Sequence, residues 1–471
     1  MARTSRTSRT YREYSSREEK PVETTIPPHA SSSRPPALPQ YNHNGHEVTP
    51  GIKPEGESGR KGIHPLKFLM ICFRSSSNAS KYVNVLWPLV PVAIVLHFAR
   101  PDLHLAIFIT NYLAMIPAAN LIGFAGQELA RKLPHVLGVI LETTLGSIVE
   151  IVLFMVLIKT SNGNSNVQVI KAAILGSILA NMLLCLGLCF IAGGMRREEQ
   201  SFHPAISEAG SGLMLVAGMG LIIPAAFSHA LVNNPAVKDL EGQTLKITRA
   251  TAVILLVAYI VFVFYQTKSH DNLYGEIFEA DEHKDEDRHR DMKKAKLTLT
   301  ECIVALTISI TCVSLIAVFL VLQIHNMVHE HHISDAFVGL ILIPLVEKAA
   351  EHLTAIDEAW DNQMNFALAH VLGASIQTAL LNTPLVILVG WGLHVEMDMK
   401  FEIFDSIVLI LAILVVGSFL RDGKSNYLEG TLCVFVYIII AVSAWHYPDP
   451  EVPQTSSSHT TPPAEGGHRM F

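Results

Sequence analysis

Long apolar stretches, separated by short polar connections, recur along this chain from about residue 84 to residue 446. Most of them are apolar on every side, which is typical of helices that face lipid and one another. A helix needs about 20 apolar residues to cross the hydrocarbon core of a bilayer. The pattern predicts eleven membrane-spanning helices, at 84–99, 103–123, 135–159, 167–193, 206–229, 246–267, 298–322, 333–359, 364–393, 401–420 and 426–446.

Composition narrows the class of protein. Of the 471 residues, 50% are hydrophobic and only 16% are charged, whereas soluble domains carry about 25% charged residues. These values exclude a soluble enzyme, a nucleic-acid binder and a secreted disulfide scaffold. The sequence therefore predicts an all-α polytopic membrane protein that is surrounded by lipid and has no nucleic-acid partner.

Three polar segments lie outside the predicted spans. Residues 1–82 are rich in Ser, Thr, Pro and Arg, and they are predicted to form a disordered tail. Residues 268–297 are predicted to form an acidic loop, and residues 447–471 a second disordered tail. The connections on the side of the N-terminus carry the pairs Arg131–Lys132 and Arg196–Arg197. The positive-inside rule then places the N-terminus and the acidic loop in the cytosol and the C-terminus on the far side.

The acidic loop divides the spans into sets. The span at 84–99 stands alone, five spans follow within 103–267, and five more lie within 298–446. Because five is odd, the second set must cross the membrane in the opposite sense to the first. Inverted repeats of this kind are common in secondary transporters.

Internal sequence similarity supports the two repeats. GSIVE at 146–150 is followed by LGSILANMLL at 175–184, and EKAAEH at 347–352 is followed by LGASIQTALL at 372–381. The two motifs follow each other in the same order in both repeats, and at a similar spacing. The predicted fold is therefore one extra helix and two inverted five-helix repeats.

Each repeat carries a carboxylate in the middle of a span, Glu150 in the first and Glu351 in the second. An ionisable side chain within a bilayer is costly and usually functional. Inverted repeats would bring the two carboxylates together, where they would suit a hard divalent cation such as Ca²⁺. Without a bound metal, the two carboxylates would repel each other and favour protonation. Metal and protons would therefore compete for the same oxygens. A protonated glutamate in a helix–helix hydrogen bond is the simpler alternative. The candidate neutral ligands are Ser147, Ser177, Ser375 and Gln377.

These motifs resemble those of the calcium/proton exchangers of fungal and plant vacuoles, within the calcium/cation antiporter superfamily. The resemblance covers residues 66–447 and includes GSIVE, VEKAAEH, LGSILAN, LIIPAAF and TPLVILVGW. It implies eleven spans in two repeats, an acidic element between the repeats, and Glu150 and Glu351 as the exchange site. It also implies Ser177, Ser375 and Gln377 as polar residues of that site, and a vacuolar or other acidic endomembrane.

The chain departs from the family motifs at four positions. Ser147 and Lys348 replace two asparagines, Glu347 replaces a glycine, and Glu142 replaces a further asparagine. A charged lysine offers no lone pair to a metal, and Lys348 can pair with Glu351 three residues later. Alternatively, Glu347 supplies the oxygen ligand that is lost with the asparagine, while the Lys348 side chain extends toward the membrane interface or binds elsewhere. We expect the residues Lys348, Glu142 and His352 to modulate the site.

The leading hypothesis is an antiporter that moves Ca²⁺, or a related divalent cation, from the cytosol into an acidic organelle in exchange for protons. It needs no cofactor, and no phosphate-binding GxxxxGK[ST] loop is present. One alternative is a transport-deficient membrane protein with a regulatory or sensor role, and another is antiport of Mn²⁺ or a monovalent cation. The sequence leaves the oligomeric state open, a homo-oligomer included.

Two weaker signals stay open as well. The acidic segment at 276–287 either binds Ca²⁺ weakly or is a solvated charged stretch. A histidine cluster is either a pH-sensing or metal-capturing group or an ordinary polar loop. Its members are His325, His329, His331 and His332.

Overall fold

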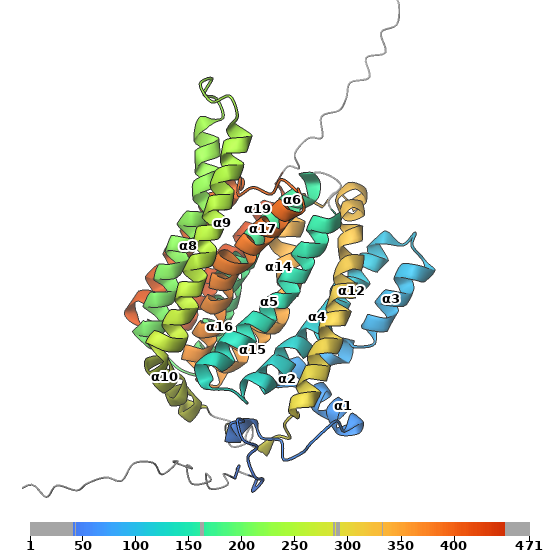
Figure 1. The fold of residues 1–471 in the computed structure, drawn as a ribbon, viewed down its shortest axis with the longest axis vertical. Helices are drawn as coiled ribbons and strands as arrows, with labels where there is room; N and C mark the ends of the chain where they lie inside the picture. The colour runs from blue at the N-terminus through green and yellow to red at the C-terminus, as the bar shows by residue number, and fades with distance from the viewer. Residues whose placement is uncertain are drawn as a thin grey trace, which may run out of the picture. The chain divides into compact units, whose positions relative to one another are not determined.

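A computed structural model describes residues 41–42, 44–160, 164–285, 288, 293–331 and 333–447. In this part of the chain nearly all regular structure is helical (Figure 1). Within these described residues, ten helices are long and apolar enough to cross a membrane. They run over Ala79–Ala99, His104–Ala130, Val136–Thr160, Val167–Gly194, Pro204–Leu231, Leu240–Ser269, Leu299–Ile324, Met364–Gly392, Ile403–Asp422 and Tyr427–Trp445.

The remaining predicted span, 333–359, is a bent helix. Pro344 has no backbone N–H to donate within a helix, and a π-helical turn lies just before it. Lys348 stands at a second break (φ −92°, ψ −4°), although its N–H still bonds to Pro344 O at 3.0 Å and its carbonyl accepts from His352 N at 2.9 Å. The bent helix consists of α13 (Asp335–Phe337), η5 (Val338–Leu342), α14 (Ile343–Glu347) and α15 (Ala349–Trp360).

The helices after α3 form two sets of five that pack on each other in matching ways. The first helices, α4 and α12, pack together; α17 packs on α9 as α19 packs on α7, and α16 packs on α8 as α18 packs on α6. This is the predicted all-α fold with one extra helix, α3. The first set is α4 (His104–Ala130), α5 (His135–Thr160), α6 (Asn164–Leu179) with η3 (Ala180–Cys185) and α7 (Leu186–Gly194), α8 (Pro204–Leu231), and α9 (Leu240–Phe264) with η4 (Tyr265–Ser269).

The second set begins with α12 and includes the bent helix. The third span of each set is interrupted by a π-helical segment, η3 in the first and η6 in the second. Such segments often mark functional sites. The other members are α12 (Leu299–His331), α16 (Met364–Gln377) with η6 (Thr378–Asn382) and α17 (Thr383–Gly392), α18 (Ile403–Phe419) with η7 (Leu420–Asp422), and α19 (Tyr427–Trp445).

The predicted acidic loop, 268–297, contains a helix, α10 (Asp271–Lys284). Asp281 of this helix accepts hydrogen bonds from Asn365 N at 2.7 Å and Asn365 Nδ2 at 2.9 Å, at the first turn of α16. A short antiparallel pair joins two other connections, β1 (Gln200–Ser201) and β2 (Lys424–Ser425). We call the side of the bundle that carries α10 the α10 face.

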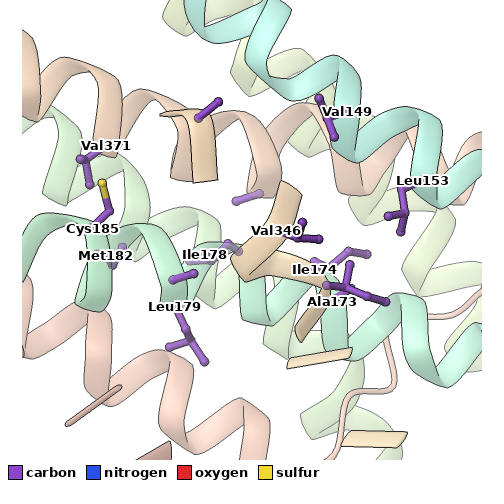
Figure 2. Packing of buried hydrophobic residues seen from close by; sticks show 14 of the residues in the cluster. Val149, Leu153, Ala173, Ile174, Ile178, Leu179, Met182, Cys185, Val346 and Val371 are labelled. Carbon is purple, nitrogen blue, oxygen red and sulfur yellow. The ribbon is translucent and has the colours of Figure 1, made fainter. Parts of the chain in front are cut away.

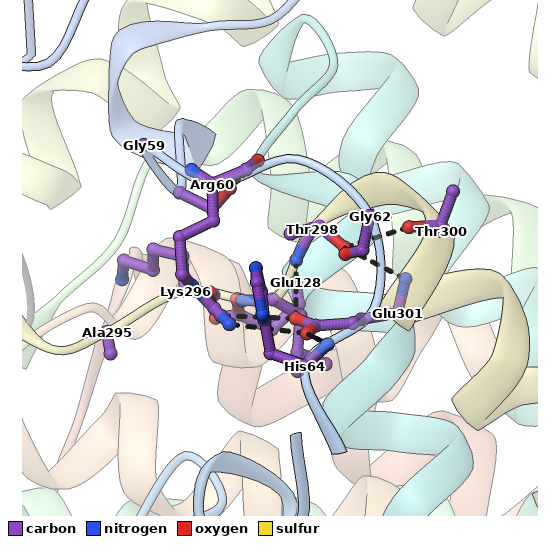
Figure 3. A network of polar contacts seen from close by, with 12 residues as sticks. Gly59, Arg60, Gly62, His64, Glu128, Ala295, Lys296, Thr298, Thr300 and Glu301 are labelled. Carbon is purple, nitrogen blue, oxygen red and sulfur yellow. Dashed lines mark hydrogen bonds and ion pairs between the residues drawn. The ribbon is translucent and has the colours of Figure 1, made fainter. Parts of the chain in front are cut away.

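The predicted disordered tail, 1–82, is wrong for the part that the structure describes. Residues 41–82 contain helices, and Figure 3 shows how Arg60 holds this segment to the start of α12. The Arg60 guanidinium lies 3.2 and 3.1 Å from the two carboxylate oxygens of buried Glu301. Composition predicts disorder because few apolar residues are present, but buried polar contacts fix the segment instead. Its elements are η1 (Pro54–Gly56), α1 (Pro65–Arg74), α2 (Asn78–Val83) and η2 (Asn84–Leu86), followed by α3 (Leu89–Ala99).

The apolar core lies between the two sets of helices. Figure 2 shows side chains of α5, α6, η3, α14 and α16 meeting there, among them Leu153, Ile174 and Val346. The helices approach closely at Gly176, where an added Cβ would lie 2.2 Å from the Leu340 carbonyl oxygen of η5. Small residues at such crossings let helix backbones pack directly. The crossing thereby brings α6 directly against η5.

Candidate cation site

The two carboxylates predicted to meet do lie around one point, and an ammonium group occupies it. Lys348 Nζ is 2.8 Å from Glu150 Oε2 and 3.4 Å from Glu351 Oε2. Lys348 and Glu150 are both fully buried. The pairing of Lys348 with Glu351 that their spacing predicted is confirmed. The contact of Lys348 with Glu150, across the two repeats, is the shorter of the two.

Glu150 is also bound by side chains of the π-helical segment η6. Thr378 Oγ1 and Asn382 Nδ2 each donate a hydrogen bond to Glu150 Oε2 at 2.9 Å. Sequence reasoning missed both donors. They are polar residues in the same apolar span as Gln377, which was the available signal, but the π turn alters which residues share a face. The two donors fix the orientation of the Glu150 carboxylate toward η6.

Glu351 lies against α5 at Gly146. A Cβ added to Gly146 would stand 2.2 Å from Glu351 Oε1, so a larger residue there would force the Glu351 carboxylate to move. Neither oxygen of Glu351 makes a hydrogen bond within the described residues, although both are buried. A buried carboxylate without hydrogen bonds is costly. Glu351 therefore has unused capacity to take a proton or a cation.

The other predicted ligands pair among themselves. Ser147 Oγ donates to Gln377 Oε1 at 2.8 Å, and Ser177 Oγ donates to Glu347 Oε1. Glu347 thus lies on the α6 side of the centre and has one buried oxygen, Oε2, with no hydrogen bond in the described structure. Ser375 differs, because its hydroxyl donates to the Val371 carbonyl of its own helix at 2.9 Å.

Of the predicted modulating residues, Lys348 lies at the centre, whereas Glu142 and His352 lie one layer further out. His352 Nε2 is 3.1 Å from Asn181 Oδ1 of η3. Glu142 lies 3.4 Å from His370 Nε2, and His370 Nδ1 is 2.7 Å from Glu358 Oε2. Sequence reasoning identified Glu142 but neither of its neighbours. Glu358 and His370 are ionisable residues near the ends of predicted spans, and the sequence shows no pattern that pairs them.

The arrangement holds a cation of its own. Among the described residues no group of three or more His, Cys, Asp or Glu side chains is placed to bind a metal ion. The Lys348 ammonium instead neutralises part of the charge of Glu150 and Glu351. A transported cation would have to displace that ammonium from carboxylates which are otherwise suited to bind it. The assignment of the individual metal ligands stays a prediction.

Comparison with known proteins identifies the family. The sequence profile of the family described as "Sodium/calcium exchanger protein" matches residues 103–268 and 302–445, which together include both repeats. The chain belongs to the sodium/calcium exchanger protein family. In this member of the exchanger family the matched residues include every predicted ligand, and the unmatched interval contains α10.

Individual relatives of this exchanger agree with the family match. The "Vacuolar calcium ion transporter" of Schizosaccharomyces pombe is 31% identical over 78% of this chain and 86% of its own. The "Vacuolar cation/proton exchanger 2" of Arabidopsis thaliana is 32% identical over 82% of this chain and 84% of its own. The solved structure "Structure of native YfkE" superposes with a TM-score of 0.61 at 22% identity, covering 76% of this chain and 99% of that one. "Crystal Structure of H+/Ca2+ Exchanger CAX" gives 0.54 at 14% identity, covering 79% and 89%. Both structures show a similar fold.

Proposed function

We propose that this chain is a cation/proton antiporter that moves Ca²⁺, or a related divalent cation, from the cytosol into an acidic organelle. The observation that carries the proposal is the convergence of Glu150 and Glu351, from opposite repeats, on one buried point. The names of its relatives, vacuolar calcium ion transporter and vacuolar cation/proton exchanger, support exchange of a cation for protons and a vacuolar membrane. The α10 face, with the N-terminal segment, would then lie in the cytosol.

The chemistry follows from the charges. A divalent cation has a stronger attraction for Glu150 and Glu351 than the single charge of Lys348, so it can displace the ammonium. Displacement leaves the Lys348 ammonium beside a metal, and like charges disfavour this state unless the lysine side chain moves away or gives up a proton. When the cation departs, the ammonium returns to the carboxylates and the site takes up the lost proton. Cation and proton thereby exclude each other from the site, which is the requirement for antiport.

The test is uptake into sealed vesicles that contain only the purified protein. With an acidic interior, the unaltered chain should accumulate ⁴⁵Ca²⁺ while the interior loses protons. Glu150→Gln and Glu351→Gln should each abolish both signals, because glutamine keeps the shape but carries no charge. Glu241→Gln, at an exposed position, is the matched control and should leave both signals intact. Normal uptake in either site variant would reject the assigned site.

A second function has one observation in its favour. The Lys348 ammonium, 2.8 Å from Glu150, already occupies the point between the two carboxylates, as expected for a transport-deficient protein with a regulatory or sensor role. Absence of proton-driven uptake by any divalent or monovalent cation in the unaltered, folded protein would support this second function and overturn the first.

A further inference from the structure

The helix α1, which precedes the first span, has a row of exposed apolar side chains along one face. Leu66, Leu69, Met70 and Phe73 stand at positions i, i+3, i+4 and i+7, which share one face of a helix. Their exposed fractions run from 48% to 80%. The opposite face carries buried Ile71, and α1 packs on α2 and α4 at the edge of the bundle (Figure 1). We call the four exposed residues the α1 stripe; no described part of the chain covers it.

The position of α1 relative to the membrane follows from its C-terminal end. Asn84 Nδ2 donates hydrogen bonds to the carbonyl oxygens of Cys72 and Phe73, at 3.0 and 3.1 Å. Asn84 lies within the membrane-spanning helix Ala79–Ala99, so the last turn of α1 is level with the first turns of that span. The α1 stripe therefore lies at the edge of the bilayer, beside a span whose outer side is apolar as well. The exposed apolar residues of that span are Tyr82, Val85, Val92, Val95 and Phe98.

The cations around the stripe have no anions beside them in the sequence. No acidic residue occurs between Glu57 and Asp102. Lys61, Lys67 and Lys81 are exposed, and none of them forms an ion pair within the described structure. Helices that lie in a membrane interface combine an apolar face with basic side chains, and anionic lipids attract basic residues close to the bilayer. The charge of this segment and its apolar stripe point to the same partner.

We infer that α1 lies in the membrane interface and binds anionic phospholipids of the leaflet on the α10 face. The α1 stripe enters the boundary between headgroups and acyl chains, while Lys61, Lys67 and Lys81 contact the lipid phosphates. A second copy of this chain is a poorer partner for the stripe, because it would bring the same lysines and like charges would oppose the contact. The inference requires only the membrane fold, so it does not depend on the proposed antiport.

Trp87 is a local probe for this contact, because it directly follows η2 at the start of the span and is partly buried. The full chain is reconstituted into vesicles of phosphatidylcholine and phosphatidylserine, in which one lipid or the other carries bromine on its acyl chains. Bromine quenches tryptophan fluorescence on contact, and subtraction of the signal of Trp87→Phe isolates Trp87. Amide hydrogen exchange of residues 65–74 is measured on the same vesicles.

Two altered chains test the two parts of the inference, the charge and the apolar face. The lysine variant combines Lys61→Gln, Lys67→Gln and Lys81→Gln, and the stripe variant combines Leu66→Ser and Leu69→Ser. All five positions are exposed, so neither variant disturbs the core. The matched control replaces three other exposed lysines, at Lys159→Gln, Lys238→Gln and Lys246→Gln.

In the unaltered chain, phosphatidylserine should quench Trp87 with at least about fivefold preference over phosphatidylcholine, the effect of one lysine near an anionic surface. The lysine variant should lower this preference to about twofold or less, and the control should keep it. The stripe variant should reduce quenching by both lipids and speed amide exchange in α1. Equal quenching by the two lipids in the unaltered chain, or a preference that the lysine variant keeps, overturns the inference. Amide protection of α1 that rises with protein concentration at constant lipid also overturns it, since a second copy then covers the stripe.

Discussion

At the scale of single residues, the distinctive feature is a lysine at the centre of the membrane. The resemblance to the exchanger motif leads us to expect asparagine at position 348, but this chain has Lys348, whose ammonium lies between Glu150 and Glu351. A unit charge about 4 Å from another is worth roughly 4 kcal/mol at an effective dielectric constant of about 20, before desolvation. Lys348 must therefore weaken the attraction of the site for any divalent cation.

Replacing Lys348 by asparagine tests this effect. Lys348→Asn removes the ammonium and returns a neutral oxygen, so we expect Ca²⁺ to bind at least about tenfold more tightly, since tenfold corresponds to about 1.4 kcal/mol. Isothermal titration on the purified protein measures the change. The double variant with Glu347→Gly should bind as tightly or more tightly, because it restores the full motif. Lys238→Asn, at an exposed loop position, is the control.

The opposite result has a definite meaning. If Lys348→Asn binds Ca²⁺ no better than the unaltered chain, the ammonium does not compete with the metal. If Glu347→Gly alone removes binding, Glu347 supplies the oxygen that the motif has lost. Its present hydrogen bond from Ser177 places it on the α6 side of the centre.

At the scale of elements, the sequence predicted where spans lie better than where they break. Apolar character identifies a span because lipid imposes it along the whole helix. A break depends on local backbone bonding, and no break was predicted from the sequence. Two prolines were available as signals, since Pro344 and Pro384 each stand two residues after a π-helical turn, η5 and η6 respectively. Ser375 was assigned to the site and Asn382 was not, although Asn382 and Thr378 are the residues of that span that donate hydrogen bonds to Glu150.

The contact between α10 and α16 gives a prediction about elements. Asp281 accepts hydrogen bonds from Asn365 N, Asn365 Nδ2 and Phe366 N, and it thereby caps the first turn of α16. Loss of a helix cap costs about 1–2 kcal/mol, so Asp281→Ala should lower the unfolding temperature of the purified protein. Hydrogen exchange should quicken first at the amides of residues 365 and 366.

Glu279→Ala is the control for the same helix, since Glu279 is exposed. Equal stability of the two variants would show that the cap is not needed. Ca²⁺ binding by the acidic segment 276–287 stays a prediction: Glu276 and Glu279 are exposed, whereas Asp281 is already used. The histidine cluster also stays a prediction, as its side chains lie outside those that the structure describes.

At the scale of the whole molecule, the sequence predicted the membrane fold and the meeting of the two repeats, but not the attachment of the N-terminal segment. Arg60 and Glu301 are 241 residues apart, and neither stands in a recognisable motif with the other. Thr298 and Glu301 do form a local capping box: Glu301 N donates to Thr298 Oγ1 at 3.1 Å and Thr298 N to Glu301 Oε2 at 3.0 Å. That local signal marks the start of α12 but does not indicate its distant partner.

Two arginine–carboxylate pairs with different burial allow a matched prediction. Glu301 is fully buried beneath Arg60, whereas Arg100 and Asp102 are each 60% exposed. Arg60→Ala leaves a buried carboxylate without its cation and should cost about 3–5 kcal/mol of folding stability. Arg100→Ala should change stability far less, because water and salt screen an exposed ion pair. Thermal unfolding of both variants in one detergent provides the comparison, and equal losses would contradict the buried pairing.

The pair between Glu150 and Lys348 has a consequence for the ancestry of the two halves. In the aligned motifs GSIVE and EKAAE, Ser147 stands at the position of Lys348, so only the second half supplies the cation. Two copies of the second half, assembled as a homodimer, would bring two lysines to the centre, together with two copies each of Glu347 and Glu351. Two copies of the first half would bring two glutamates and no lysine. A centre with a single ammonium therefore requires two halves that differ at this position, which a fused pair provides and a self-associating half-length protein does not.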